Sequence, residues 1–171
     1  YGGAFQTGST CEKEFNGEQL ARQGVVVVSI AYRLNVFGFF AHAMLEKEAV
    51  DGRPCANFGF LDQRMGIQWV KDNIALFGGD PANITVFGQS AGAASALAQS
   101  VSPMNDGLFQ RVIMQSGGGT GLFNRHLWSL EDAQRNGARF LKYLEVESIA
   151  EARSVPATDL LEAAVTFPAC D

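Results

Sequence analysis

Three apolar runs along the chain predict strands of a sheet. Residues 84–87 read ITVF and residues 111–115 read RVIMQ, and each run is followed by glycine or serine. The earlier run at residues 25–31, VVVVSIA, is β-branched and hardly alternates, which is typical of a strand buried on both faces of a parallel sheet. We therefore expect strands at all three places.

Helical spacing of apolar residues separates these runs. Residues 62–77 carry apolar side chains at the period of an α-helix, at Met65, Trp69, Val70, Ile74 and Phe77, before two glycines end the pattern. Further helices are predicted over residues 18–23, 91–101, 130–144, 148–153 and 157–166. Residues 1–10 read as a loop. Residues 32–60 are long, aromatic and irregular, and a loop of that length either has a function or carries small elements.

The alternation of these strands and helices indicates the fold class. Its order is β-α-β-α-β-α, which predicts an α/β fold with a mostly parallel sheet, right-handed crossovers and helices flanking the sheet. No repeat, low-complexity segment or linker interrupts the chain. Residues 1–171 are therefore expected to be one piece of one α/β domain.

The composition is that of a globular domain and indicates neither a nucleic-acid partner nor a membrane-spanning helix. The chain is 47% hydrophobic and 18% charged, which is typical of a globular domain rather than a disordered segment. The net charge is −5 and the sequence has no run of lysine or arginine, so nothing indicates a nucleic-acid surface. No apolar stretch reaches the ~18 residues that a membrane-spanning helix needs. The oligomeric state stays open.

The cysteines predict neither a metal site nor a disulfide framework. Cys11, Cys55 and Cys170 are odd in number, widely spaced and free of any C-x-x-C pair. A single disulfide remains open, and the pattern leans toward a cytoplasmic protein. The first residue is Tyr1 rather than methionine, so we expect an internal fragment whose compartment and signal peptide cannot be read.

The main chemical signal is the pentapeptide at residues 88–92, GQSAG, between a predicted strand and a predicted helix. Strand, G-x-S-x-G and helix together form the context of a nucleophile elbow, which holds its serine, here Ser90, in a strained turn. The N–H of Ala91 would then lie at a helix N-terminus, where negative charge is stabilised. The alternative is an ordinary strand-to-helix turn, because glycine and serine are common in loops.

A second segment could supply the donors that such a serine needs. Serine attack on a carbonyl requires a base, a group that orients the base, and N–H donors for the developing oxyanion. The glycine-rich start of the chain could aim the N–H groups of Gly3 and Ala4 into a cavity, with Ala91 completing an oxyanion hole. Each lost donor of this kind typically costs about 2.7–4 kcal/mol of transition-state stabilisation. A plain turn is the alternative, and the downstream elbow favours the oxyanion role.

Five segments carry a resemblance to a known family. Residues 1–9, 31–39, 57–64, 77–92 and 109–117 read YGGAFQTGS, AYRLNVFGF, NFGFLDQR, FGGDPANITVFGQSAG and FQRVIMQSG. In this order they resemble the motifs of the type-B carboxylesterase/lipase family, which includes the cholinesterases, and the likeness extends to about residue 125. It implies a partial α/β-hydrolase fold lacking its N-terminal strands and C-terminal part. It also implies cleavage of small-molecule carboxylic esters without a cofactor.

The resemblance assigns roles to individual residues. Ser90 would be the nucleophile that carries the acyl group, and Gly3, Ala4 and Ala91 would form the oxyanion hole. Ser116 and Gln89 would support the site from behind, Ser116 as a hydrogen-bond partner. Arg33 and Asp62 would form a buried ion pair, the alternative being two unrelated surface charges.

Three departures from the family pattern refine the expectation. Gln89 stands where the family commonly has glutamate, and the lost negative charge argues against a site specialised for cationic choline esters. Ala4 replaces a more usual glycine, which keeps the N–H and adds a methyl group beside the acyl or alcohol side. Glu145 and Val146 stand where a cysteine is often found, which argues against a secreted, disulfide-bonded member.

The catalytic base and acid are expected outside this chain. In α/β hydrolases the acid and then the histidine follow the serine, and in the resembled family both lie well over a hundred residues later. His42 precedes Ser90, and His126 follows it too closely, so both are interpreted as solvated or capping residues. The chain alone is therefore expected to be inactive and poorly stable. The alternative function is a non-catalytic, cholinesterase-like binding or adhesion module.

Overall fold

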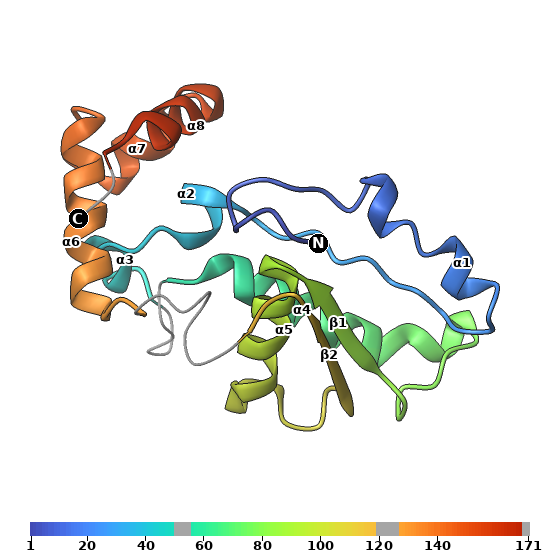
Figure 1. Ribbon diagram of the computed structural model, residues 1–171. Helices are drawn as coiled ribbons and strands as arrows, with labels where there is room; N and C mark the ends of the chain where they lie inside the picture. Colours follow the sequence, from blue (N-terminus) through green and yellow to red (C-terminus); the bar gives the residue numbers. More distant parts are fainter. Residues whose placement is uncertain (50–55, 119–126, 169–171) are drawn as a thin grey trace. The chain divides into compact units, whose positions relative to one another are not determined.

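The computed structural model describes residues 1–49, 56–118 and 127–168, and the chain forms two compact units (Figure 1). The first unit comprises Tyr1–Tyr32 and Phe60–His126, and the second comprises Arg33–Gly59 and Leu127–Asp171. All six candidate site residues from the sequence lie in the first unit.

The first unit is built around a pair of strands and one helix. β1 (Thr85–Gln89) and β2 (Arg111–Gln115) pair in parallel, with Thr85 opposite Arg111 and Gln89 opposite Gln115. Between them the chain forms α5 (Ala91–Val101), which packs along both strands (Figure 1). This confirms the predicted parallel sheet and the predicted bounds of α5 and β2.

The other elements of the first unit are short helices and turns. They are η1 (Lys13–Phe15), α1 (Glu18–Ala21), η2 (Ile74–Phe77) and η3 (Pro103–Asn105), together with most of α4 (Phe58–Asn73). The structure thus confirms the predicted early helix in a shorter form. A turn follows the helix and ends at Gly24, which has φ +87°.

Small residues allow α5 to lie close to the strands. Ala91, Ala93 and Ala94 are fully buried. Where β1 turns into α5 the backbones almost touch, because a Cβ built at Gly88 would lie 2.4 Å from the carbonyl carbon of Gly92. Only glycine fits at Gly88, so the two glycines of the pentapeptide set the approach of helix to strand.

The structure moves the predicted helix at residues 62–77 and changes its buried face. The helix α4 begins four residues earlier, at Phe58, and η2 replaces its last turn. Its buried side is formed by residues at helical spacing, namely Gln63, Ile67, Val70 and Ile74. Three of the apolar residues that predicted the helix are exposed, Met65, Trp69 and Phe77. The periodicity therefore identified the helix but not its whole buried face, which includes the polar Gln63 and leaves Met65, Trp69 and Phe77 exposed.

The predicted strand at residues 25–31 is wrong for the part of the chain that the structure describes. The backbone there is an extended trace between α1 and α2 (Figure 1), and it joins no hydrogen-bonded ladder. Val25, Val26 and Val28 are 53%, 45% and 40% exposed rather than buried. A β-strand requires hydrogen bonds to a neighbouring strand. Within the described residues the sheet consists of β1 and β2, and residues 25–31 pair with neither.

The second unit is helical. It contains α2 (Asn35–Phe39), α3 (Ala43–Glu46), α6 (Leu130–Tyr143), α7 (Ile149–Ser154) and α8 (Ala157–Thr166). Leu45, Leu141 and Ile149 form its buried core. The three later helices confirm the predictions, and α2 and α3 are small elements inside the long aromatic segment. Across the described parts of both units, no helix combines the length and apolar character needed to span a membrane.

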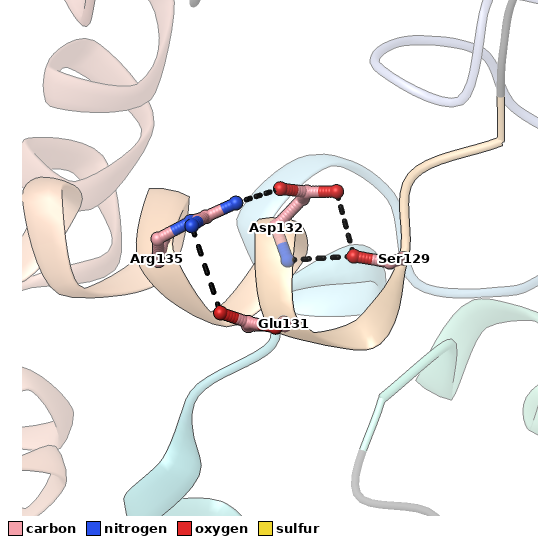
Figure 2. A network of polar contacts seen from close by, with 4 residues as sticks. All are labelled: Ser129, Glu131, Asp132 and Arg135. Carbon is pink, nitrogen blue, oxygen red and sulfur yellow. Dashed lines mark hydrogen bonds and ion pairs between the residues drawn. The ribbon is translucent and has the colours of Figure 1, made fainter.

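A polar network fixes the start of α6 (Figure 2). The Ser129 hydroxyl accepts a hydrogen bond from the Asp132 N–H at 3.1 Å and donates to the Asp132 carboxylate at 2.6 Å. Arg135 pairs with Asp132 and lies 3.6 Å from the Glu131 carboxylate. The hydrogen bond from Ser129, followed by that from Arg135, lowers the pKa of Asp132. An N-cap of this kind satisfies backbone donors that the helix leaves free, and so defines where α6 begins.

Candidate active site

Ser90 occupies the junction between β1 and α5 in a strained conformation. Its backbone has φ 56° and ψ −121°, a region that residues other than glycine rarely adopt. The turn is held on both sides. The Ser90 N–H donates to the Gln115 carbonyl at 2.9 Å, and the Ser90 carbonyl accepts from the Ala94 N–H at 3.0 Å. This geometry is the sharp strand-to-helix turn that the pentapeptide predicted.

The glycine-rich segment at the start of the chain lies against this turn. A Cβ built at Gly2 would lie 3.2 Å from both the Gln89 carbonyl oxygen and the Ser90 Cβ. From the opposite side, a Cβ built at Gly92 would lie 2.8 Å from the Tyr1 carbonyl oxygen. Glycines at these two positions let the two backbones approach each other directly. The structure therefore brings together the two segments that the sequence paired by chemistry.

The N–H groups of the candidate oxyanion donors have no protein acceptor in the part of the chain that the structure describes. Gly3 and Ala4 have φ +103° and 54°, and the Gly3 carbonyl accepts from the N–H groups of Gln6 and Thr7 at 2.9 and 3.1 Å. This turn uses the carbonyl of Gly3 and leaves its N–H unused. Within residues 1–49, 56–118 and 127–168, the N–H groups of Gly3, Ala4 and Ala91 donate to no other protein group. Ala91 is fully buried, whereas Gly3 is partly exposed and Ala4 is exposed.

Ser116 and Gln89 both lie beside the serine turn. Ser116 follows β2 directly and is exposed, with φ 53°. A Cβ built at its neighbour Gly117 would lie 2.5 Å from the Ser90 carbonyl oxygen, so this segment touches the turn. Gln89 is exposed, and its Oε1 lies 3.2 Å from the Cβ position at Gly2. The hydrogen-bonding role of Ser116 stays a prediction.

Comparisons with known proteins identify the family of the chain. Residues 1–168 match the model of the carboxylesterase family. The chain belongs to the carboxylesterase family. It is 41% identical over 167 residues to para-nitrobenzyl esterase of Bacillus subtilis, and the aligned region covers 96% of this chain and 32% of that protein. It is 42% identical over 137 residues to fumonisin B1 esterase of Sphingopyxis macrogoltabida, and the aligned region covers 80% of this chain and 24% of that protein.

Solved structures show the same relationship. A carboxylesterase of Geobacillus stearothermophilus superimposes with a TM-score of 0.82 and 42% sequence identity, covering 97% of this chain and 34% of that one. A structure described as PNB esterase gives a TM-score of 0.82 with 38% identity, covering 97% and 34%. The chain therefore has part of an α/β-hydrolase fold, as predicted. This carboxylesterase-family chain spans about a third of the length of these solved structures.

Two tyrosines outside the predicted site hold the glycine-rich segment of this carboxylesterase-family chain. The Tyr1 hydroxyl donates to the Tyr32 carbonyl at 3.0 Å and accepts from the Tyr32 N–H at 3.3 Å. In return, the Tyr32 hydroxyl donates to the Tyr1 carbonyl at 3.1 Å. The rings stack with centroids 4.4 Å apart. Sequence reasoning assigned these residues no role, although Tyr1 directly precedes the glycines and Tyr32 directly follows the apolar run at residues 25–31.

His42, one of the two histidines of this carboxylesterase-family chain, caps a helix. It belongs to the second unit, where its Nδ1 accepts the Met44 N–H at 3.1 Å at the start of α3. It stacks on Phe40, and burial lowers its pKa. The interpretation of His42 as a capping residue is confirmed, whereas His126 lies outside the described residues.

Other predictions in this family member stay untested. Arg33 and Asp62 belong to different units, so their pairing remains a prediction. Cys11 is exposed and, among the residues described, forms no disulfide. Cys55 and Cys170 lie outside the described residues.

Proposed function

We propose that this chain carries the nucleophile and the oxyanion hole of an enzyme that hydrolyses carboxylic esters. The observation that carries the proposal is the position of Ser90, strained at a strand-to-helix turn and directly beside the glycine-rich segment at Gly2. Family membership and relatives named as esterases support the same reaction class.

The proposed reaction proceeds through an acyl-enzyme. The Ser90 oxygen attacks the ester carbonyl carbon while a base takes the hydroxyl proton. The tetrahedral oxyanion collapses and the alcohol leaves with that proton. Water then attacks the acyl-enzyme by the same route, releasing the acid and restoring the serine. The reaction needs no cofactor.

The N–H groups of Gly3, Ala4 and Ala91 are proposed to bind the oxyanion. They have no protein acceptor among the residues that the structure describes, so an incoming oxygen displaces no internal hydrogen bond. The Ala91 N–H also lies at the N-terminus of the 11-residue helix α5, where the helix dipole favours negative charge. Donors that are already oriented stabilise the oxyanion more than water does, because they need not reorganise during the reaction.

The substrates are proposed to be uncharged esters. Gln89 directly precedes the serine, is exposed, and contributes no charge beside it. A negative side chain at that place would raise the local concentration of cationic esters, and the amide does not. The methyl group of Ala4 is exposed next to the proposed donors, where it would limit the bulk of the bound group.

The base and the acid of the triad are proposed to come from residues outside this chain. His42, the histidine that the structure describes, uses its Nδ1 to cap α3. Residues 1–171 alone are therefore expected to show no appreciable Ser90-dependent ester hydrolysis, because an oxyanion hole without a base gives only a small residual rate. An assay with p-nitrophenyl acetate checks this, and measurable turnover that disappears in Ser90→Ala would contradict it.

A fluorophosphonate probe tests the nucleophile directly. The complete gene product that contains this chain is incubated with the probe and digested, and the modified peptide is sequenced by mass spectrometry. We expect one phosphonylated residue, Ser90, and loss of labelling in Ser90→Ala. Ser116→Ala is the matched control, because Ser116 also follows a strand and also has a positive φ. This variant should be labelled at Ser90 to the same extent as the parent protein.

Two outcomes would overturn the proposal. Labelling at Ser116 would place the nucleophile on the other strand. A folded protein that resists labelling altogether would favour the binding or adhesion module, because the fold alone does not imply activity.

A further inference from the structure

The Tyr32 hydroxyl holds a backbone carbonyl that lies next to the serine turn. It donates to the Tyr1 carbonyl at 3.1 Å, and the same carbonyl oxygen is the atom that a Cβ at Gly92 would meet at 2.8 Å. Gly92 is two residues beyond Ser90, and Tyr1 is two residues before Gly3. One hydroxyl therefore holds the segment that carries the candidate donors at the point where its Tyr1 carbonyl lies against Gly92 of α5.

Tyr32 remains a donor at physiological pH. Burial, the largest effect, and the neighbouring Tyr1 together raise its pKa to about 12, against the opposing effect of a side-chain hydrogen bond with Ser95. The neutral phenol is therefore the form that persists, and its proton stays directed at the Tyr1 carbonyl.

A buried polar network fixes Ser95 in turn. The Gln63 side-chain amide donates to the Ser95 hydroxyl at 2.9 Å, and the Gln99 amide donates to the Gln63 Oε1 at 3.1 Å. Asn105 donates to the Gln99 Oε1 at 2.7 Å. All four side chains are buried, and they connect α4, α5 and η3. Breaking one of these bonds would leave a buried polar group without water to replace it. At the far end of the network, the buried Asn105 Oδ1 has no partner within the described residues.

We propose that Tyr32 is a positioning residue for the candidate oxyanion hole. Its hydroxyl fixes the Tyr1 carbonyl against Gly92, and this sets where the Gly3 and Ala4 N–H groups lie relative to Ser90. The Ser95 hydroxyl forms a hydrogen bond with the Tyr32 side chain, and Gln63 donates to that serine. This inference rests on the proposed esterase function and adds a residue that does not touch the substrate.

Tyr32→Phe tests the inference because it removes one oxygen and keeps the ring that stacks on Tyr1. Steady-state kinetics on p-nitrophenyl butyrate are measured with the complete gene product, with the active serine titrated by phosphonate. The inhibition constant of a trifluoromethyl ketone, which forms an oxyanion when serine adds to it, is measured in parallel. We expect kcat to fall about tenfold with KM within about twofold, and the ketone to bind more weakly by the same factor as kcat, since one hydrogen bond is lost.

The matched control is Tyr143→Phe. It makes the same chemical change in the second unit, where the Tyr143 hydroxyl lies 3.1 Å from the Thr166 hydroxyl. Its kcat and ketone affinity should equal those of the parent. A Tyr32→Phe protein with a lower melting temperature but parental kcat and ketone affinity would mean that Tyr32 is merely structural, and this would overturn the inference.

Ser95→Ala is the second variant, in case Tyr32→Phe does not fold. It should lower kcat and ketone affinity in the same direction, whereas Ser100→Ala on the same helix should not, because the Ser100 hydroxyl donates to the Leu97 carbonyl of its own helix. Parental values for Ser95→Ala would also overturn the inference. If the parent protein is neither labelled at Ser90 nor active, the proposed function fails and this inference with it. An active, labelled parent with unaffected variants contradicts the inference alone.

Discussion

The two strands of the sheet end alike, yet only one of them ends at a candidate catalytic residue. Gln89 and Gln115 are paired in the last rung of the ladder, and each is followed by a serine with positive φ, 56° at Ser90 and 53° at Ser116. Ser90 is partly buried and begins the turn into α5. Ser116 is exposed, and residues 117 and 118 after it are not helical.

Under the proposed function, a strained serine at a strand end is not by itself a reactive site. What sets Ser90 apart is what surrounds it, namely the N-terminus of α5 with the Ala91 N–H and the glycine-rich segment in contact at Gly2. Ser116 also follows a strand and a glutamine and also has a positive φ, but the described residues directly after it, 117 and 118, are not helical. The proposal therefore assigns the nucleophile from the helix and the neighbouring segment rather than from the strand and serine alone.

The largest expected effect separates the two serines. In the complete gene product, Ser90→Ala should lower kcat for p-nitrophenyl butyrate by about 10⁴- to 10⁶-fold, because the nucleophile is lost. Ser116→Ala should keep kcat within about tenfold of the parent, because it loses at most a supporting hydrogen bond. Initial-rate kinetics at saturating substrate measure both. Equal losses in the two variants would mean that Ser116 takes part directly in the reaction.

An intermediate effect is expected at the glycines two residues after each serine. Gly92→Ala would push its methyl group against the Tyr1 carbonyl, 2.8 Å away, and displace the segment that carries the candidate donors. We expect kcat to fall about 10- to 100-fold, as a displacement near 1 Å does in an active site.

Gly118→Ala is the matched change at the other strand end. Its Cβ would meet the Met114 sulfur at an ordinary 3.6 Å, but φ is +115°. Thermal unfolding should show a cost of roughly 1–3 kcal/mol from that backbone strain, and kcat should stay parental. A parental kcat for Gly92→Ala would show that contact between the segment and the helix does not matter for the reaction.

The smallest effect concerns charge beside each serine. Gln89→Glu should raise the rate ratio of a thiocholine ester over its uncharged isostere about threefold, because one negative charge near the site attracts the cation through solvent. Gln115→Glu adds the same charge at the paired position of β2, beside a serine without the candidate donors, and should change the ratio less. The effect should shrink at high ionic strength. A ratio that responds equally to both variants would show only a general surface potential.

Several elements could be predicted from the sequence because their signals are local. The bounds of α5, β2 and α8 agree with the pattern, and the strained turn at Ser90 follows from glycines on both sides of a serine. The start of α4 was missed because its first turn, from Phe58, looks like the aromatic loop before it.

The run at residues 25–31 shows the limit of a local signal. Its valines have strong strand propensity, but propensity provides no hydrogen-bonding neighbour. In the described part of the chain these residues remain an extended segment with exposed side chains.

The sequence by itself determined the candidate nucleophile, the candidate donors and the order of strand, turn and helix between them. Backbone conformation and helix starts depend on residues a few positions apart, so their signals survive in the linear chain. Only the tertiary structure decided that Tyr32 holds Tyr1 and that Gln63 reaches Ser95, pairs 31 and 32 residues apart. Such contacts depend on the path of the whole backbone, because buried polar groups must find partners wherever the fold brings them together.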